Sequence, residues 1–158
     1  MSRSIAVHRS RSYSADADRA FDTVMPMDLS RIFRRGFGPL PAIAGVEGQD
    51  GDWSRAGQTR TVLLGDGSRV TERLTAVEPK RRFSYVLTEP TGTMRFLVSH
   101  VDGRWEFSST PSGGSTVTWS WRLHPRSTAA VPALLLLGRL WNGYARQALD
   151  DLAPVLDG

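Results

Sequence analysis

Apolar and polar residues alternate through the middle of the chain and recur at helical spacing toward its end. Between residues 43 and 123, the alternating segments predict strands. Residues 130–156 carry apolar side chains every three or four positions, which predicts one long helix. The strands are separated by turn sequences rich in Gly, Pro and Asp, at residues 65–67, 78–81, 89–92 and 111–114. Strands at such short and regular intervals predict an antiparallel meander.

The N-terminal part predicts a strand followed by two short helices. The strand covers residues 5–14, and Ser14 or Asp16 is placed to cap the first helix. Asp28 is placed to cap a second helix over residues 29–35. With the meander and the C-terminal helix, these elements indicate an α+β protein.

The turns also predict which residues of the meander share a face. The predicted inner face carries Leu63, Val70, Leu74, Phe83, Tyr85, Leu87, Phe96 and Val98. The predicted outer face carries Arg60, Arg69, Thr71, Arg73, Ser84 and Thr88. One buried and one wet face is expected of an antiparallel sheet. This register assumes a two-residue turn at Asp66 and Gly67, and it places Tyr85 opposite both Leu74 and Val98.

The last hairpin predicts an irregularity in its first strand. Its turn pairs Trp105 with Trp119. Trp105, Val98 and His100 are all predicted to face inward. In a regular strand, however, Trp105 would lie on the opposite face from Val98 and His100, because successive side chains alternate between the two faces. A β-bulge near residues 102–103 reconciles the two sets.

Four polar side chains with inward parity are candidates for chemistry. Glu72 is a candidate general acid or base, or else a structural carboxylate paired with an inward Arg, since burying a lone carboxylate is costly. His100 is a candidate proton shuttle or a hydrogen-bonded histidine at a cavity rim. Tyr85 is a candidate donor to a ligand carbonyl, or a packed aromatic whose hydroxyl reaches Glu72 or water. Arg11 points inward by parity, or else is an exposed edge residue.

Composition narrows the function classes. The 158 residues suit one domain over 1–158, and the net charge of +4 is weak evidence for a nucleic-acid partner. The chain has no Cys, and its three His are too scattered for a local metal motif, so no metal site is expected. The most apolar stretch, residues 129–137, is too short to span a membrane. Without a signal-peptide pattern at the N-terminus, a soluble cytoplasmic protein is predicted.

Several short motifs, in their order, resemble those of one superfamily. They are residues 17–21 (ADRAF), Trp53 with Gly57, residues 70–73 (VTER), residues 77–85 (VEPKRRFSY) and residues 113–119 (GGSTVTW). The chain resembles the START-like, or SRPBCC (helix-grip), superfamily and, within it, the polyketide cyclase/dehydrase-like branch. The resemblance implies a curved seven-stranded sheet around the long C-terminal helix, with a cavity for a hydrophobic ligand. It also makes Arg11 a candidate for orienting an enolate, as inward Arg and Tyr do in cyclase-like members.

Three functions remain open from the sequence. The first is a carrier or sensor that binds a lipid, polyketide or isoprenoid, as a monomer or homodimer, without cofactor. The second is a cofactor-free cyclase or dehydratase that uses Glu72, His100, Tyr85 and Arg11. The third is a stress or toxin–antitoxin-type regulator that acts through a protein partner.

The residues predicted to line the cavity are Leu74, Phe83, Leu87, Phe96, Val98, Trp105, Trp119, Trp121, Leu134 and Trp141. The leucine run in residues 134–137 is a candidate portal, dimer contact or peripheral membrane contact.

Overall fold

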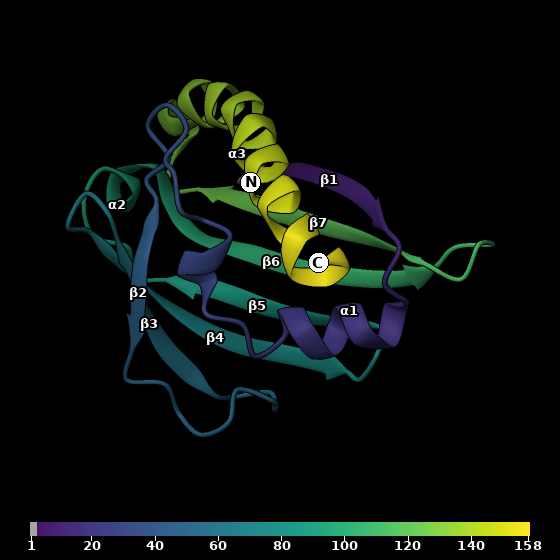
Figure 1. Ribbon diagram of the computed structural model, residues 1–158. Coiled ribbons are helices and arrows are strands. Elements are labelled where there is room, and N and C mark those ends of the chain that lie inside the picture. The colour runs from purple at the N-terminus through teal and green to yellow at the C-terminus, as the bar shows by residue number, and fades with distance from the viewer. Residues whose placement is uncertain (1–2) are drawn as a thin grey trace.

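Seven strands form one antiparallel sheet that curves around a long C-terminal helix (Figure 1). The computed structural model describes residues 3–158. The strands are β1 (Ile5–Tyr13), β2 (Ile43–Glu47), β3 (Thr59–Leu64), β4 (Arg69–Glu78), β5 (Arg82–Thr88), β6 (Val98–Ser109) and β7 (Ser115–Pro125). Their order in the sheet is β1-β7-β6-β5-β4-β3-β2. The predicted α+β helix-grip architecture is confirmed.

The helices lie on the inner face of the sheet, which is the face toward the C-terminal helix, or at its ends (Figure 1). They are α1 (Ala17–Val24), η1 (Leu29–Arg31), α2 (Met94–Leu97), η2 (Thr128–Ala130) and α3 (Val131–Asp157). The Asp16 side chain caps α1, as predicted. The second short helix is only the turn η1, because the backbone leaves the helix to bury Ile32 and Phe33 in the core. No helix within residues 3–158 is long and apolar enough to cross a membrane.

The predicted register between β3 and β4 is wrong by one residue. The hairpin loop contains three residues rather than two, because Leu64 accepts a hydrogen bond from the N–H of Gly67 (3.0 Å) and donates one to Ser68 (2.9 Å). Gly67 has φ of +87°, the left-handed conformation that such a loop places at its last residue. A one-residue shift exchanges the two faces of a strand. Arg60, predicted on the wet face, therefore lies opposite Glu72 and is buried.

The predicted pairing of β5 with β6 is also wrong. Residues 94–97 form α2, so the connection is longer than a tight turn and β6 pairs five residues farther along. Tyr85 lies opposite Gly103 rather than Val98, while its predicted pairing with Leu74 is confirmed. Phe96, predicted on the inner face, lies in α2 and is 62% exposed.

A bulge does interrupt the first strand of the last hairpin, but at a different place. The pairing of Trp105 with Trp119 is confirmed. The register shifts between Val98 and His100, rather than near residues 102–103. Val98 therefore stays inside, and His100 turns to the outer face of the sheet, away from α3. The expectation that His100 points inward is wrong for this reason.

Candidate functional site

A cavity of about 360 Å³ lies between the inner face of the sheet, α2 and the N-terminal half of α3. Its wall is mostly apolar, and its exposed polar lining residues, such as Asp66, Arg69 and Thr91, belong to connecting loops or strand ends. Deeper in the wall, the buried polar side chains are those of Tyr85, Glu72 and Tyr144. A concave, mostly apolar pocket with a few placed polar groups is the usual form of a small-molecule site.

Tyr85 is the best-defined polar group of the cavity. Its hydroxyl oxygen accepts hydrogen bonds from the indole N–H groups of Trp119 (2.8 Å) and Trp121 (3.1 Å). Burial raises the pKa of Tyr85, so the hydroxyl keeps its proton at neutral pH. Among residues 3–158, no side chain or carbonyl accepts that proton. The hydroxyl therefore has a free donor at the cavity wall.

Gly103 makes room for the Tyr85 ring. A Cβ atom built at Gly103 would lie 2.0 Å from Cζ of Tyr85. The ring lies over this glycine on the neighbouring strand, and its hydroxyl reaches Trp119 and Trp121 on β7. The glycine at position 103 thus determines where the Tyr85 hydroxyl lies, because any larger residue there would displace the Tyr85 ring.

Glu72 forms a buried ion pair in the same wall. Nε of Arg60 donates to Oε1 of Glu72 at 2.7 Å, and both side chains are about 5% exposed or less. The Arg60 guanidinium also lies 4.0 Å from the ring centre of Trp53 and donates to Gln49 (3.3 Å). Burial raises the pKa of the Glu72 carboxyl, and the charge of Arg60 opposes that shift. The inward Arg expected as its partner is thus Arg60 of β3, in the arrangement of a structural ion pair.

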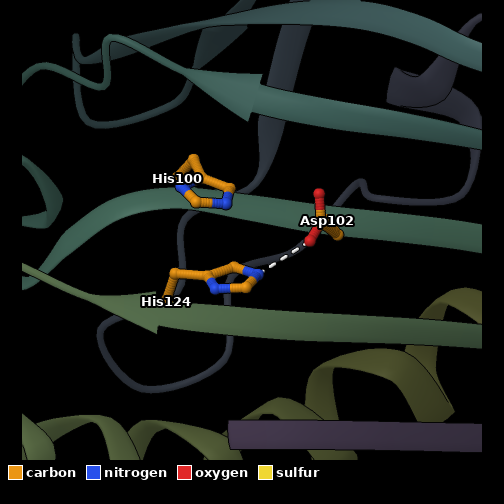
Figure 2. A group of neighbouring side chains, drawn as sticks. All are labelled: His100, Asp102 and His124. Carbon is orange, nitrogen blue, oxygen red and sulfur yellow. Dashed lines mark hydrogen bonds and ion pairs between the residues drawn. The ribbon is translucent and has the colours of Figure 1, made fainter. Parts of the chain in front are cut away.

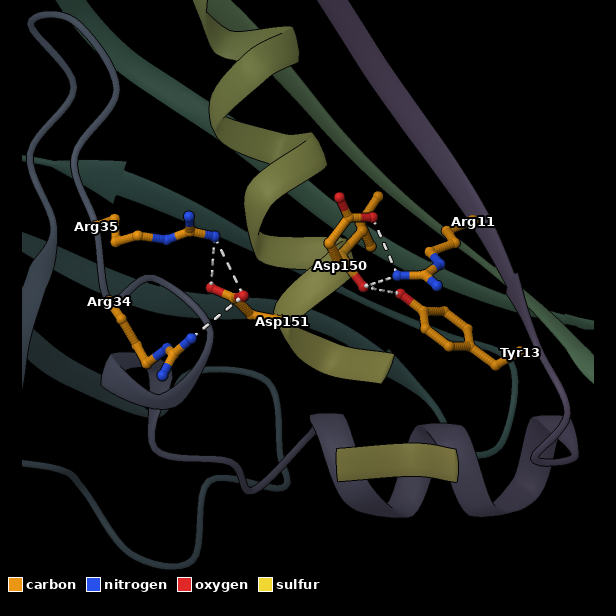
Figure 3. A network of polar contacts seen from close by, with 7 residues as sticks. Arg11, Tyr13, Arg34, Arg35, Asp150 and Asp151 are labelled. Atoms are coloured by element: carbon orange, nitrogen blue, oxygen red, sulfur yellow. Dashed lines mark hydrogen bonds and ion pairs between the residues drawn. The ribbon is translucent and has the colours of Figure 1, made fainter. Parts of the chain in front are cut away.

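The other two candidates for acid–base chemistry lie outside the cavity. His100 is on the outer face of the sheet. Arg11 does point toward α3, but its guanidinium donates to Asp150 (3.0 Å) and to the carbonyl of Leu149 (3.4 Å) at the C-terminal end of that helix (Figure 3). Of the four candidates, only Glu72 and Tyr85 line the cavity.

Four of the ten residues predicted to contact a ligand line the cavity, namely Leu87, Val98, Trp119 and Trp121. Five others pack in the core outside its lining, namely Leu74, Phe83, Trp105, Leu134 and Trp141. Phe96 is exposed on α2. Phe83 packs against Phe21 of α1, and Trp141 of α3 packs against Trp119, so these side chains fill the core rather than the cavity wall.

The sequence reasoning missed a second stripe of α3. Ala133, Leu136, Leu137, Leu140 and Tyr144 all line the cavity and recur at helical spacing. This spacing is a usable signal, but it adjoins the stripe through Leu134 and Trp141 that packs in the core, so periodicity alone does not separate the two faces. Also missed were Phe33, Leu40 and Pro41 from the loop after η1, Val62 from the misregistered strand β3, and Met94 and Leu97 from α2.

The open seven-stranded sheet, the long helix and the cavity between them define an SRPBCC-type helix-grip protein. Residues 4–157 match the family described as polyketide cyclase/dehydrase and lipid transport, and the chain belongs to that family. No curated protein matches the sequence.

Solved structures share this fold at low sequence identity. A point mutant of norcoclaurine synthase from Thalictrum flavum, in complex with a transition-state analogue, is 15% identical, with a TM-score of 0.74 over 99% of this chain and 96% of that one. A protein of Nitrosospira multiformis is 18% identical, with a TM-score of 0.69 over 96% of each chain. Ara h 8.0201 is 15% identical, with a TM-score of 0.59 over 92% and 95% of the two chains. These likenesses concern the fold alone.

Proposed function

We propose that this protein binds a small, largely apolar molecule that carries an oxygen acceptor such as a carbonyl, and that it acts as a carrier or sensor. The observation that carries the proposal is the Tyr85 hydroxyl. It accepts hydrogen bonds from Trp119 and Trp121 and has its own proton free at an apolar wall. A ligand oxygen would satisfy this buried donor, whose isolation is otherwise unfavourable.

The cavity's size and lining support a ligand of lipid, polyketide or isoprenoid type. Its volume of about 360 Å³ is within the range of small-molecule sites. The indole rings of Trp119 and Trp121 provide flat apolar surfaces beside the Tyr85 donor. The family description includes lipid transport, and norcoclaurine synthase, which shares the fold, has been solved with dopamine and hydroxybenzaldehyde.

A cyclase or dehydratase activity has weaker support. Such a reaction was expected to use four polar groups, and only Glu72 and Tyr85 line the cavity. Burial raises the pKa of Tyr85, so the phenol stays protonated and is not available as a base, and Arg60 holds the Glu72 carboxylate in an ion pair. A regulator that acts only through a protein surface is also less supported, because such a protein has no need of a cavity of about 360 Å³ and its core is expected to be filled.

The proposal can be tested with Prodan, a fluorescent aromatic ketone whose emission reports both polarity and hydrogen bonding. The purified protein is expected to bind Prodan saturably, with emission shifted to the blue. Tyr85→Phe removes only the hydroxyl, and should weaken binding by roughly three- to tenfold, the equivalent of one hydrogen bond.

Tyr13→Phe is the matched control. Its hydroxyl is also buried and donates to the carbonyl of Leu149 (2.6 Å), but Tyr13 does not line the cavity. Prodan affinity should be unchanged in this variant. Absence of saturable binding, or equal losses in Tyr85→Phe and Tyr13→Phe, would contradict the proposal. Native mass spectrometry of gently purified protein, followed by organic extraction, would then identify the class of any molecule carried.

A further inference from the structure

We infer that His100, Asp102 and His124 form a binding site for a divalent transition-metal ion such as Zn²⁺ on the outer face of the sheet. His100 and Asp102 lie on β6, and His124 lies on β7 (Figure 2). One ligand atom from each residue can be chosen so that all three lie within 4.8 Å of one another. The site is separate from the cavity, because the sheet lies between them.

The bulge in β6 creates this juxtaposition. It turns His100 outward and places it directly opposite His124 in the register of β6 and β7. The two imidazole rings stack with centroids 3.9 Å apart and planes 15° from parallel. Asp102, two residues after His100, has its side chain on the same face, and its carboxylate accepts a hydrogen bond from Nε2 of His124 at 2.7 Å. The bulge thus brings His100 to the face that already carries Asp102 and His124.

The donor set suits zinc. Zn²⁺ binds imidazole nitrogen and carboxylate oxygen, and sites with three protein ligands leave a fourth position for water. Ser99 Oγ lies 3.0 Å from Nδ1 of His100, so this ring has a hydrogen-bond partner on one nitrogen and its Nε2 remains for an ion. Partners of this kind fix ring orientation and tautomer at metal sites.

The carboxylate is also available to an ion. Arg122 lies directly across from Asp102 on β7, but its guanidinium donates to Ser4 Oγ (2.9 Å) instead. The Asp102 side chain is 51% exposed and that of His124 is 23% exposed, so both can rotate. Ligand atoms at zinc bond lengths of about 2.0–2.1 Å stand closer together than 4.8 Å. Binding therefore requires the stacked rings to tilt toward one point, and the ion replaces the contact between Asp102 and His124.

Zinc binding is measured on untagged, metal-free protein by isothermal titration calorimetry and by competition with a chromogenic zinc indicator. One ion per chain is expected. His100→Asn, His124→Asn and Asp102→Asn should each lower the affinity by more than about tenfold, since even outer-shell partners of metal ligands contribute that much. The histidine ring resonances of the wild type should shift in NMR spectra during the titration.

His8→Asn is the matched control, because His8 is the third histidine, lies exposed on β1 and is not part of the cluster. It should bind zinc like the wild type. Circular dichroism establishes that each variant is folded, and Prodan binding should be unaffected, since the cavity is on the other face. Absence of stoichiometric binding at micromolar zinc, or an affinity unchanged by all three cluster variants, overturns the inference.

Discussion

At the scale of single residues, the chemistry of the cavity depends on how Tyr85 is held. Its ring occupies space that exists only because position 103 lacks a side chain. Two indole donors then occupy the acceptor capacity of the hydroxyl oxygen. A phenol in this setting acts as a donor, because burial also raises its pKa. The function of Tyr85 thus depends on a glycine that never contacts the ligand space.

Gly103→Ala should therefore displace Tyr85. The new Cβ would lie 2.0 Å from the ring, so the ring must leave Trp119 and Trp121. Overpacking of this kind costs about 1–3 kcal/mol of unfolding free energy, measurable by urea denaturation. Prodan affinity should fall at least as far as in Tyr85→Phe. The control is Gly45→Ala in β2, where an added Cβ meets nothing within 4 Å. Equal stability of the two variants would show that the ring can move at no cost.

Glu72 shows why the sequence predicts some residues of this site and not others. Its inward position and its need for an arginine partner followed from the alternation of β4 and the cost of a buried carboxylate. The identity of the partner did not follow, because Arg60 changes face with a one-residue shift of β3. That shift depends on whether the hairpin loop has two or three residues, and the Gly-Asp-Gly sequence is compatible with both.

At the scale of elements, α3 is fixed at its C-terminal half by two adjacent aspartates (Figure 3). Asp150 accepts a hydrogen bond from Arg11 of β1. Asp151, whose side chain is only 13% exposed, lies 3.4 Å from Arg34 and 3.2 Å from Arg35, both in the loop after η1. That loop continues into Leu40 and Pro41 of the cavity wall. The turn of α3 that carries Asp150 and Asp151 is thus joined by ion pairs to the edge strand β1 and to the loop that forms part of the cavity wall.

Asp151→Asn should loosen the loop without unfolding the protein. The Asn side chain loses the charge that attracts Arg34 and Arg35, at a cost of about 1 kcal/mol or less for partly exposed pairs. Amide hydrogen exchange should become severalfold faster at Phe37 and Ile43, which donate to Leu40 (2.8 Å) and Phe33 (2.8 Å).

Asp150→Asn provides the comparison for that experiment, because it removes a neighbouring charge that holds β1 instead of the loop. Its exchange rates at Phe37 and Ile43 should match those of the wild type. Identical exchange in both variants would mean that the loop is held by its apolar contacts alone.

Element order was predictable from the sequence, whereas two of the pairings were not. Turn signals and periodicity located the strands and the C-terminal helix, since both depend on local patterns. The pairing of β5 with β6 failed because residues 94–97 form a helix where a tight turn was expected. The outward turn of His100 follows from a bulge whose presence was predictable from parity but whose position was not.

At the scale of the whole molecule, each of the three tyrosines forms a hydrogen bond between different elements of the fold. Tyr13 at the end of β1 donates to the carbonyl of Leu149 in α3 (2.6 Å). Tyr144 in α3 donates to the carbonyl of Pro41 in the cavity wall (2.8 Å), and Tyr85 bonds to β7. All three hydroxyls are buried, and burial raises the pKa of each above its ordinary value of 10. Deprotonating any of them in place would leave a buried negative charge beside an acceptor or in an apolar wall.

This arrangement predicts that the tyrosines ionise only when the protein unfolds. An acid whose pKa is raised by folding contributes stability that is present below pH 10 and is lost as pH rises toward its folded pKa. Above pH 10 the unfolded chain releases three protons that the folded chain keeps, so the unfolding free energy should fall by about 4 kcal/mol per pH unit. Urea denaturation at a series of alkaline pH values measures this slope.

Tyrosinate absorbance distinguishes this prediction from ordinary titration. It should stay low through pH 10 and rise in one cooperative step, together with loss of the near-ultraviolet circular dichroism signal. Tyr13→Phe should reduce the pH dependence of the unfolding free energy by about 1.4 kcal/mol per pH unit, the share of one proton. A gradual rise in absorbance near pH 10 with the circular dichroism spectrum still native would show that solvent reaches these hydroxyls in the folded protein. The Tyr85 donor would then be hydrated rather than reserved for a ligand, and the cavity would need a different account of its selectivity.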